Sequence, residues 1–266
     1  MKRKKQIRNI SRAGLKLAEG LFSHTVDMSL WFIVYLSSMS FPQKTTGQLW
    51  RAQIAADQFI NQINYDVIKQ AIVNAKRKGY IKKSRRHAWP EITQAGKHRL
   101  ASLLPQYDEK RAWDDRMHLV TYDIPEKRRK DRALLREYLN RIGCGRLQDS
   151  VWLTPYNPID TIRSFIEKRG LRGTVIVSDL GKDGSVGEED LAGLLVRLYR
   201  LDAVNKHYEE WLNDVKSHGV DHWHVIRYLA ILKEDPQLPF ALLPAWWKGE
   251  VAHRKVRGDL QRLLVN

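Results

Sequence analysis

The residue with the clearest chemical potential is Asp123, which ends the otherwise apolar stretch Met117–Ile124. A carboxylate at the end of a strand can ligate Mg²⁺, and a second copy across a dimer axis would supply another ligand for a nuclease. The structural alternatives are that Asp123 caps the next turn or pairs with a nearby arginine. Those arginines are Arg128, Arg129 and Arg132.

One carboxylate per chain is a small ligand set for a dication. The basic run Lys127–Lys130 also opposes a dication nearby through like-charge repulsion. We therefore expect Asp123 to be structural, with no bound metal, and the protein not to be an enzyme.

Three histidines and one cysteine complete the set of candidate ligands. His218, His222 and His224 lie close in sequence, but their spacing matches no tetrahedral metal site and few acids are near. Cys144 is the single cysteine, so an internal disulfide and cysteine-based metal clusters are excluded. The sequence predicts no cofactor and a reducing compartment.

A different chemistry, recognition of polyanions, is indicated by the charge. The chain has 46 Lys and Arg against 30 Asp and Glu, a net charge of +16. Such a balance is typical of proteins that bind nucleic acid. The segment Lys76–Arg99 is the densest part, because it contains nine basic residues and the single acid Glu91.

The elements that would present these charges are helices followed by a hairpin. Ile68, Ala71, Ile72 and Ala75 have the spacing of a buried helix face, and Gly79 stands where a C-cap belongs. The outward positions, which would enter the major groove, are Asp66, Lys69, Gln70, Val73, Asn74 and Arg77.

Two short apolar pieces, Tyr80–Ile81 and Trp89–Ile92, flank a basic tip, and a helix restarts at Thr93. The tip would contact the DNA backbone through Lys82, Lys83, Arg85, Arg86 and His87. Three helices, a basic hairpin and a further helix form the order of a winged helix-turn-helix, so the expected partner is double-stranded DNA.

The middle of the chain alternates strands and helices. We expect a strand over Met117–Ile124, a helix over Arg128–Ile142, a strand over Arg146–Thr154, a helix over Ile159–Arg169 and a strand over Gly173–Gly181. The inner face of the first helix is predicted to be Leu134, Leu135, Tyr138 and Leu139. This alternation predicts an α+β protein with a central ferredoxin-like βαββαβ domain.

The predicted organisation has five parts. They are a basic N-terminal arm (1–23), a winged helix (24–104), a polar linker (105–116), the central domain as dimer platform (117–184) and a helical C-terminal domain (185–266). The last part is interrupted by "EDPQLPFALLPAWWKGE", a proline-rich, non-helical segment. The longest apolar run, Met28–Leu36, is too short to span a membrane, so we expect no membrane contact.

Two motifs resemble a known family. "VTYDIPEKRRKDRALLREYLNRIGCGRLQDSVWLTPY" resembles the central domain of PaaX-type transcriptional regulators and the second Cas family of CRISPR adaptation. "ILKEDPQLPFALLPAWWKGEVAHR" resembles the C-terminal signature of the same regulators. The resemblance implies a dimeric DNA-binding repressor with an aromatic acyl-CoA effector. It carries over only Asp123, as the position of the nuclease family's metal-binding aspartate.

We therefore expect a cytoplasmic, nucleoid-associated homodimer that represses transcription. One alternative is a metal-dependent nuclease or CRISPR-adaptation-like protein using Asp123. The other is an architectural DNA-binding protein without a ligand. The more than 100 residues that precede the central core favour the regulator, because a stand-alone adaptation protein is expected to lack a DNA-reading wing.

Overall fold

The computed structural model describes residues 72–83, 91–181, 190–220 and 222–265. Contacts divide the chain into two units, which we describe separately. The central unit consists of Tyr107–Lys206 and Asp235–Trp247. The helical unit contains the other described residues, namely 72–83, 91–106, 207–220, 222–234 and 248–265.

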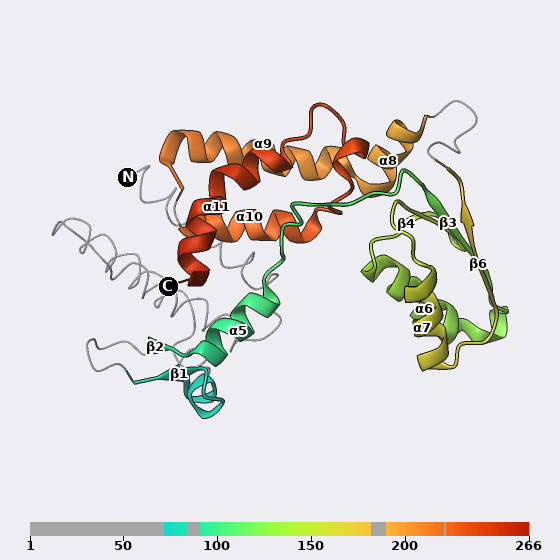
Figure 1. The fold of residues 1–266 in the computed structure, drawn as a ribbon, viewed down its shortest axis with the longest axis horizontal. Helices are drawn as coiled ribbons and strands as arrows, with labels where there is room; N and C mark the ends of the chain where they lie inside the picture. Colours follow the sequence, from blue (N-terminus) through green and yellow to red (C-terminus); the bar gives the residue numbers. More distant parts are fainter. Residues whose placement is uncertain (1–71, 84–90, 182–189, 221, 266) are drawn as a thin grey trace, which may run out of the picture. The chain divides into compact units, whose positions relative to one another are not determined.

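The central unit is built on a four-stranded antiparallel sheet with the strand order β4-β5-β3-β6 (Figure 1). Its strands are β3 (His118–Asp123), β4 (Gly145–Gln148), β5 (Val151–Thr154) and β6 (Thr174–Asp179). The connecting helices are the short 3₁₀ helix η1 (Glu126–Arg128), α6 (Arg129–Arg141) and α7 (Ile159–Arg169). The βαββαβ order and this strand order are those of a ferredoxin-like fold. The mixed α+β class is confirmed.

One strand was predicted wrongly. The expected strand Arg146–Thr154 is a hairpin, because the chain turns at Asp149 and Ser150 and pairs Gln148 with Val151. Asp and Ser are common turn residues, and here they divide one apolar stretch into β4 and β5. The hairpin supplies the fourth strand that the βαββαβ order requires.

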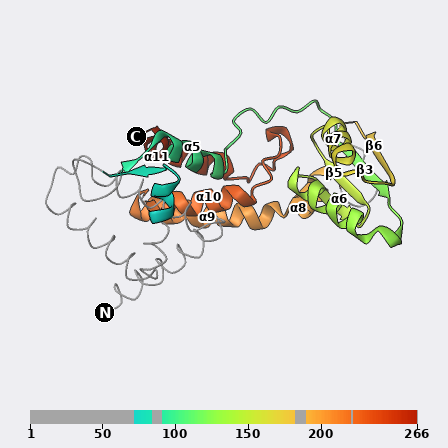
Figure 2. The same cartoon turned by 90° about the horizontal axis from the view of Figure 1, so that it is seen from below.

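α6 and α7 cover one face of the sheet (Figure 2). Leu135 and Leu139 of α6 are fully buried against Val120 and Trp152. Tyr138 stacks on Phe165 of α7 with ring centroids 3.7 Å apart, which adds to area burial. Leu134, expected on the inner face, is 39% exposed because it lies beside that face rather than under it.

The opposite face of the sheet packs against α8 (Leu191–Tyr199). Leu195 of α8 is buried with Met117 and Leu153, and Leu119 of β3 packs against this cluster. Val120 belongs to the core under α6 and α7, so strand alternation sends successive β3 residues to two different cores. A Cβ on Gly145 would lie 2.5 Å from side-chain atoms of Leu198, so glycine permits this approach of α8 to β4 without a shift of that side chain.

Cys144 is buried on the face of the sheet that α6 and α7 cover. Burial raises the pKa of its thiol to about 12, and a hydrogen bond with Thr154 offsets part of that rise. The thiol is therefore neutral at physiological pH.

The helical unit contains the hairpin region and a helical core. Its elements are β1 (Ile81–Lys82), β2 (Glu91–Ile92), α5 (Gln94–Leu103), α10 (His222–Glu234), α11 (Gly249–Val265) and the larger part of α9 (Leu201–His218). Tyr208, Trp211 and Tyr228 are fully buried and in ring contact. The proline-rich segment between α10 and α11 contains the 3₁₀ turn η2 (Phe240–Leu242) and belongs to the central unit.

Candidate functional site

The basic region begins where the helical residues 72–77 end and the chain turns into β1. Gly79 has a φ of +72°, which only glycine adopts at low cost. The amide of Tyr80 donates to Ala75 O at 2.9 Å, and the amide of Gly79 donates to Lys76 O at 3.0 Å. These two bonds form a Schellman motif, so the predicted C-cap at Gly79 is confirmed.

Thr93 fastens the hairpin to the helices on both sides. Its hydroxyl donates to Gly79 O at 2.6 Å and accepts from the amide of Gly96, the N-cap bond of α5, at 3.2 Å. Its own amide donates to Tyr80 O at 2.9 Å. The Thr93 side chain therefore connects the end of the helix at residues 72–77 to the start of α5.

Antiparallel pairing of β1 and β2 confirms the short strands at the hairpin base. Ile81 lies opposite Ile92, and both pack with Ala75. Lys82 lies opposite Glu91, and their charged groups are 3.5 Å apart with the lysine 65% exposed. A cross-strand pair this exposed contributes little stability, so Lys82 remains available to a stronger anionic partner.

Three of the predicted base-reading residues lie on described helix. Val73 is 53% exposed, Arg77 is exposed and Asn74 is half-buried, while Ala75 faces the interior. Arg77 Nη2 donates to Asn74 Oδ1 at 3.1 Å, which directs the guanidinium along the helix surface. The remaining predicted residues lie outside the described residues: Asp66, Lys69, Gln70, Arg85, Arg86 and His87.

The described part of this region is strongly basic. Residues 72–83 and 91–106 contain one acid, Glu91. Their basic residues are Lys76, Arg77, Lys78, Lys82, Lys83, Lys97 and Arg99. A rigid helix–hairpin–helix carrying this charge can contact phosphates, while neutral Asn74 and Val73 can approach base edges.

Asp123 is exposed at the end of β3, opposite Thr174 of β6. The arginines that were its expected partners pair with other acids: Arg128 with Asp131 at 3.7 Å, and Arg129 and Arg132 with Glu126. Across the described ranges, no three His, Cys, Asp or Glu side chains are grouped so that they could hold a metal ion.

The neighbouring Tyr122 takes part in a network that sequence reasoning missed. Its hydroxyl donates to Asp149 O at 2.5 Å and accepts from Arg136 Nε at 2.9 Å. Arg136 and Arg146 lie 3.4 Å and 3.7 Å from the Asp149 carboxylate. The bond to Tyr122 is the main cause of the raised pKa of Arg136. The network fixes α6 to the β4–β5 turn.

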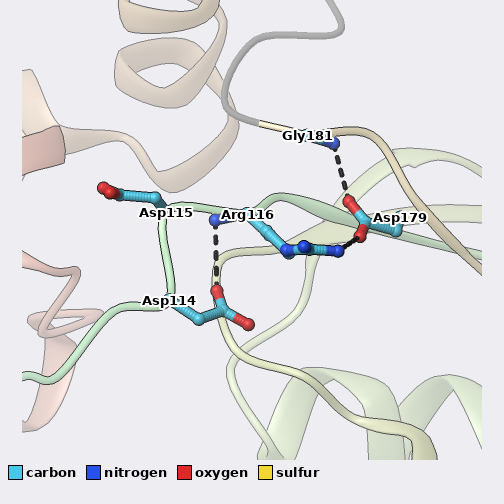
Figure 3. A pocket seen from close by; sticks show the side chains of 5 residues that line it. All are labelled: Asp114, Asp115, Arg116, Asp179 and Gly181. Carbon is cyan, nitrogen blue, oxygen red and sulfur yellow. Dashed lines mark hydrogen bonds and ion pairs between the residues drawn. The ribbon is translucent and has the colours of Figure 1, made fainter.

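The start of β3 has a second polar cluster, beside an open pocket lined by Asp114, Asp115, Arg116, Asp179 and Gly181 (Figure 3). Arg116 forms an ion pair with Asp179, whose other oxygen accepts from the amide of Gly181 at 2.7 Å. That backbone bond, followed by the bond from Arg116, lowers the pKa of the Asp179 carboxyl. The Asp179 carboxylate in this pocket therefore stays ionised, and its charge is balanced by Arg116.

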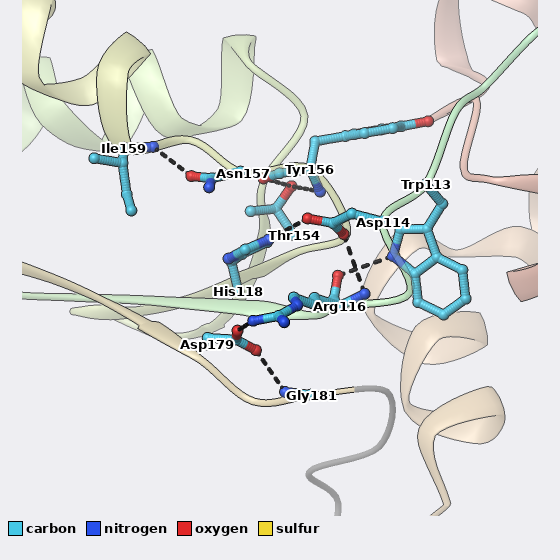
Figure 4. A network of polar contacts seen from close by, with 10 residues as sticks. All are labelled: Trp113, Asp114, Arg116, His118, Thr154, Tyr156, Asn157, Ile159, Asp179 and Gly181. Carbon is cyan, nitrogen blue, oxygen red and sulfur yellow. Dashed lines mark hydrogen bonds and ion pairs between the residues drawn. The ribbon is translucent and has the colours of Figure 1, made fainter.

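His118 joins the same polar cluster from the face of the sheet that α6 and α7 cover (Figure 4). The imidazole is buried, and its Nε2 lies 3.6 Å from Asp114 Oδ2, beyond hydrogen-bond distance. Asp114 Oδ1 accepts from the amide of Arg116 at 3.1 Å, and Trp113 Nε1 donates to Arg116 O at 2.8 Å. These bonds shape the chain just before the sheet, which indicates a structural role.

Of the three clustered histidines, only the side chain of His224 is described. It is buried, with Nε2 3.4 Å from Asp214 Oδ2. Its backbone oxygen accepts from Trp211 Nε1 at 2.7 Å. This histidine thus joins α9 to α10 by structural contacts. Among the described helices, none combines the length and apolarity needed to span a membrane.

Comparison with known proteins bears on the central unit. Residues 110–191 match the family described as the PaaX protein central Cas2-like domain, which confirms the resemblance drawn from Val120–Tyr156. No curated protein matches the chain. Among solved structures, the uncharacterized protein Rv0674 from Mycobacterium tuberculosis is similar with a TM-score of 0.48 and 19% identity, over 76% of this chain and 84% of its own.

Proposed function

We propose that this chain, which carries the central Cas2-like domain of PaaX proteins, is a sequence-specific DNA-binding regulator of transcription that represses as a homodimer. The observation that carries the proposal is the basic region at residues 72–83 and 91–106, where a capped helix end, a hairpin base and α5 are bonded into one rigid support. In this proposal Asp123 is structural and the protein is not an enzyme.

The test of the DNA contact is the salt dependence of binding. Replacing Lys82 and Lys83 with Ala removes two phosphate contacts, so the slope of log K against log[salt] should flatten by about two units. The matched control is Lys127→Ala with Lys130→Ala, which removes the same charge from exposed positions in the central unit. Equal slopes for the two double variants would contradict the hairpin contact.

Base reading is tested on the adjacent helix. Asn74→Ala should lower affinity for an operator selected from random DNA by about 1–3 kcal/mol and leave binding to unselected DNA nearly unchanged. Lys78→Ala is the contrasting variant, because an exposed lysine that contacts phosphate weakens binding to both DNAs alike. If Asn74→Ala also weakens both alike, Asn74 does not read bases.

The dimer is supported by the edge of the central sheet. β6 is an edge strand, and its residues Thr174–Ser178 carry no charge in a chain of net charge +16. Ile176 on this strand is 55% exposed. An uncharged, β-branched edge is a template for pairing with another strand, and two copies can meet there without like-charge repulsion.

Sedimentation velocity tests this interface. Ile176→Lys should convert the dimer to a monomer, because an edge lysine prevents strand pairing. Leu134→Lys, at an apolar position of similar character on α6 that is 39% exposed, should leave the dimer intact. A dimer of unchanged affinity in Ile176→Lys would place the interface elsewhere.

The effector is proposed on the family resemblance. An aromatic acyl-CoA such as phenylacetyl-CoA should release the protein from its operator at micromolar concentration. Free CoA and phenylacetate, tested separately, are the controls. An operator complex that is indifferent to the thioester would remove this class of effector from the proposal.

A further inference from the structure

Arg111, in the segment that follows α5, is buried in the central unit with no exposed side-chain area. Its Nε donates to Asp108 O at 3.1 Å and its Nη1 donates to Leu238 O at 3.2 Å. Its Nη2 lies 3.8 Å from Asp235 Oδ2 and makes no hydrogen bond among the described residues. The guanidinium is therefore held by two segments that are far apart in sequence.

Aromatic rings complete the enclosure of this guanidinium. Its central carbon lies 4.6 Å from the ring centroid of Tyr107 and 4.8 Å from that of Phe240. A desolvated cation at this distance is attracted by the ring quadrupole. Each ring comes from a different one of the two segments, so Arg111 is the centre of their contact.

Further bonds join the same segments around Arg111. Gln237 Oε1 accepts from the amide of Asp108 at 2.8 Å, and Gln237 O accepts from the Tyr156 hydroxyl at 2.9 Å. The amide of Gln237 donates to Asp235 Oδ1 at 2.7 Å. Both segments are thereby tied to each other and to the chain after β5.

The backbone is strained at the two residues that make most of these contacts. Arg111 has a φ of +38° and Gln237 a φ of +49°, values that residues with a side chain rarely adopt. Such conformations persist only where surrounding contacts hold them. We therefore expect that loss of the Arg111 contacts lets the backbone relax at both Arg111 and Gln237.

We propose that residues 107–111 and 235–240 form one conformational element, which we name the Arg111 clasp, and that they open and close together. The first segment follows α5, and the second follows α10. The clasp therefore couples two of the chain connections between the central and helical units, so displacement of one connection displaces the other. This inference does not depend on DNA binding.

Hydrogen exchange of the full chain tests the clasp through the amides of Asp108, Lys110, Arg111 and Gln237, all of which donate to side chains within it. Arg111→Met keeps an unbranched side chain as far as the position of Nε but removes the guanidinium that lies beside Asp235. Exchange should rise about tenfold or more in both segments by a similar factor, while β3 and β6 keep their protection.

The matched control is Arg163→Met, which removes the exposed ion pair between Arg163 and Asp160 in the same unit. This control should leave both segments unchanged. A rise in Arg111→Met that is confined to one segment, or absent from both, would overturn the proposal.

A milder variant keeps the test valid if Arg111→Met does not fold. Tyr156→Phe removes only the hydrogen bond to Gln237 O. Exchange should still rise in both segments, by about two- to fivefold, because opening of one segment opens the other. A rise limited to residues 235–240 would show that the segments open independently and would refute the clasp.

Discussion

The sharpest prediction concerns Gly96, a buried residue in the first turn of α5. A Cβ at this position would lie 2.2 Å from Tyr80 O and 2.7 Å from Ile92 Cγ1, whereas ordinary contact begins at 3.4 Å. Gly96→Ala therefore requires a backbone carbonyl to move by about 1.2 Å, the difference between 3.4 Å and 2.2 Å. That carbonyl also accepts the amide of Thr93, so the hairpin base moves with it.

Two opposing contributions set the magnitude. Alanine is favoured over glycine in a helix by about 1 kcal/mol, whereas overpacking against immobile atoms costs about 1–3 kcal/mol or more. Since the closest atom here is backbone, we expect the clash to exceed the helical gain, with a net loss of about 1–2 kcal/mol. The operator affinity should fall as well, because Tyr80 joins the helix to the hairpin.

Gly258 in α11 is the matched control, since a Cβ built there meets no described atom within 4 Å beyond its own helix backbone and chain neighbours. Gly258→Ala should raise the free energy of unfolding by up to about 1 kcal/mol. Urea denaturation followed by circular dichroism measures both variants. A Gly96→Ala protein as stable as the wild type would refute the close packing of α5 on Tyr80.

Two further outcomes are expected. Wild type and Asp123→Ala should both leave DNA and RNA uncut in Mg²⁺ or Mn²⁺; metal-dependent cleavage lost in Asp123→Ala would establish the nuclease alternative. The lowered pKa of Asp179 means that its charge stabilises the folded state above pH 3.8 and that this stabilisation is lost as the pH falls through the folded-state pKa. Carboxyl NMR titration should give a midpoint below 3.8, and a midpoint at or above that value would contradict the bonds from Gly181 and Arg116.

The central fold was largely predictable because its signals are local. The helix Ile159–Arg169 has the expected bounds and begins directly after Asn157-Pro158, and Gly170 ends it in a left-handed conformation. The turn at Asp149 and Ser150 could have been found from its residue types, but the apolar residues on both sides favoured a single strand. Leu134 was misplaced because spacing defines a helical face only to within about one residue.

The contacts that matter most for the clasp were beyond sequence reasoning. Arg111 and Asp235 are 124 positions apart, and nothing in their neighbourhoods marks either as buried. The proline-rich stretch around Asp235 was expected to be rigid, but its partner depends on the path of the whole chain. The proposed DNA-contacting residues Asn74, Arg77 and Lys82, by contrast, were chosen from helical spacing and charge, which are local in the sequence, and their role stays a prediction.

The buried state of Cys144 gives the protein a practical property for spectroscopy. A neutral thiol without solvent access reacts slowly with maleimides, and the chain has no other cysteine. A new cysteine at an exposed position such as Lys83 would be the single site of rapid attachment, so a fluorophore can report on the hairpin without first deleting a native thiol.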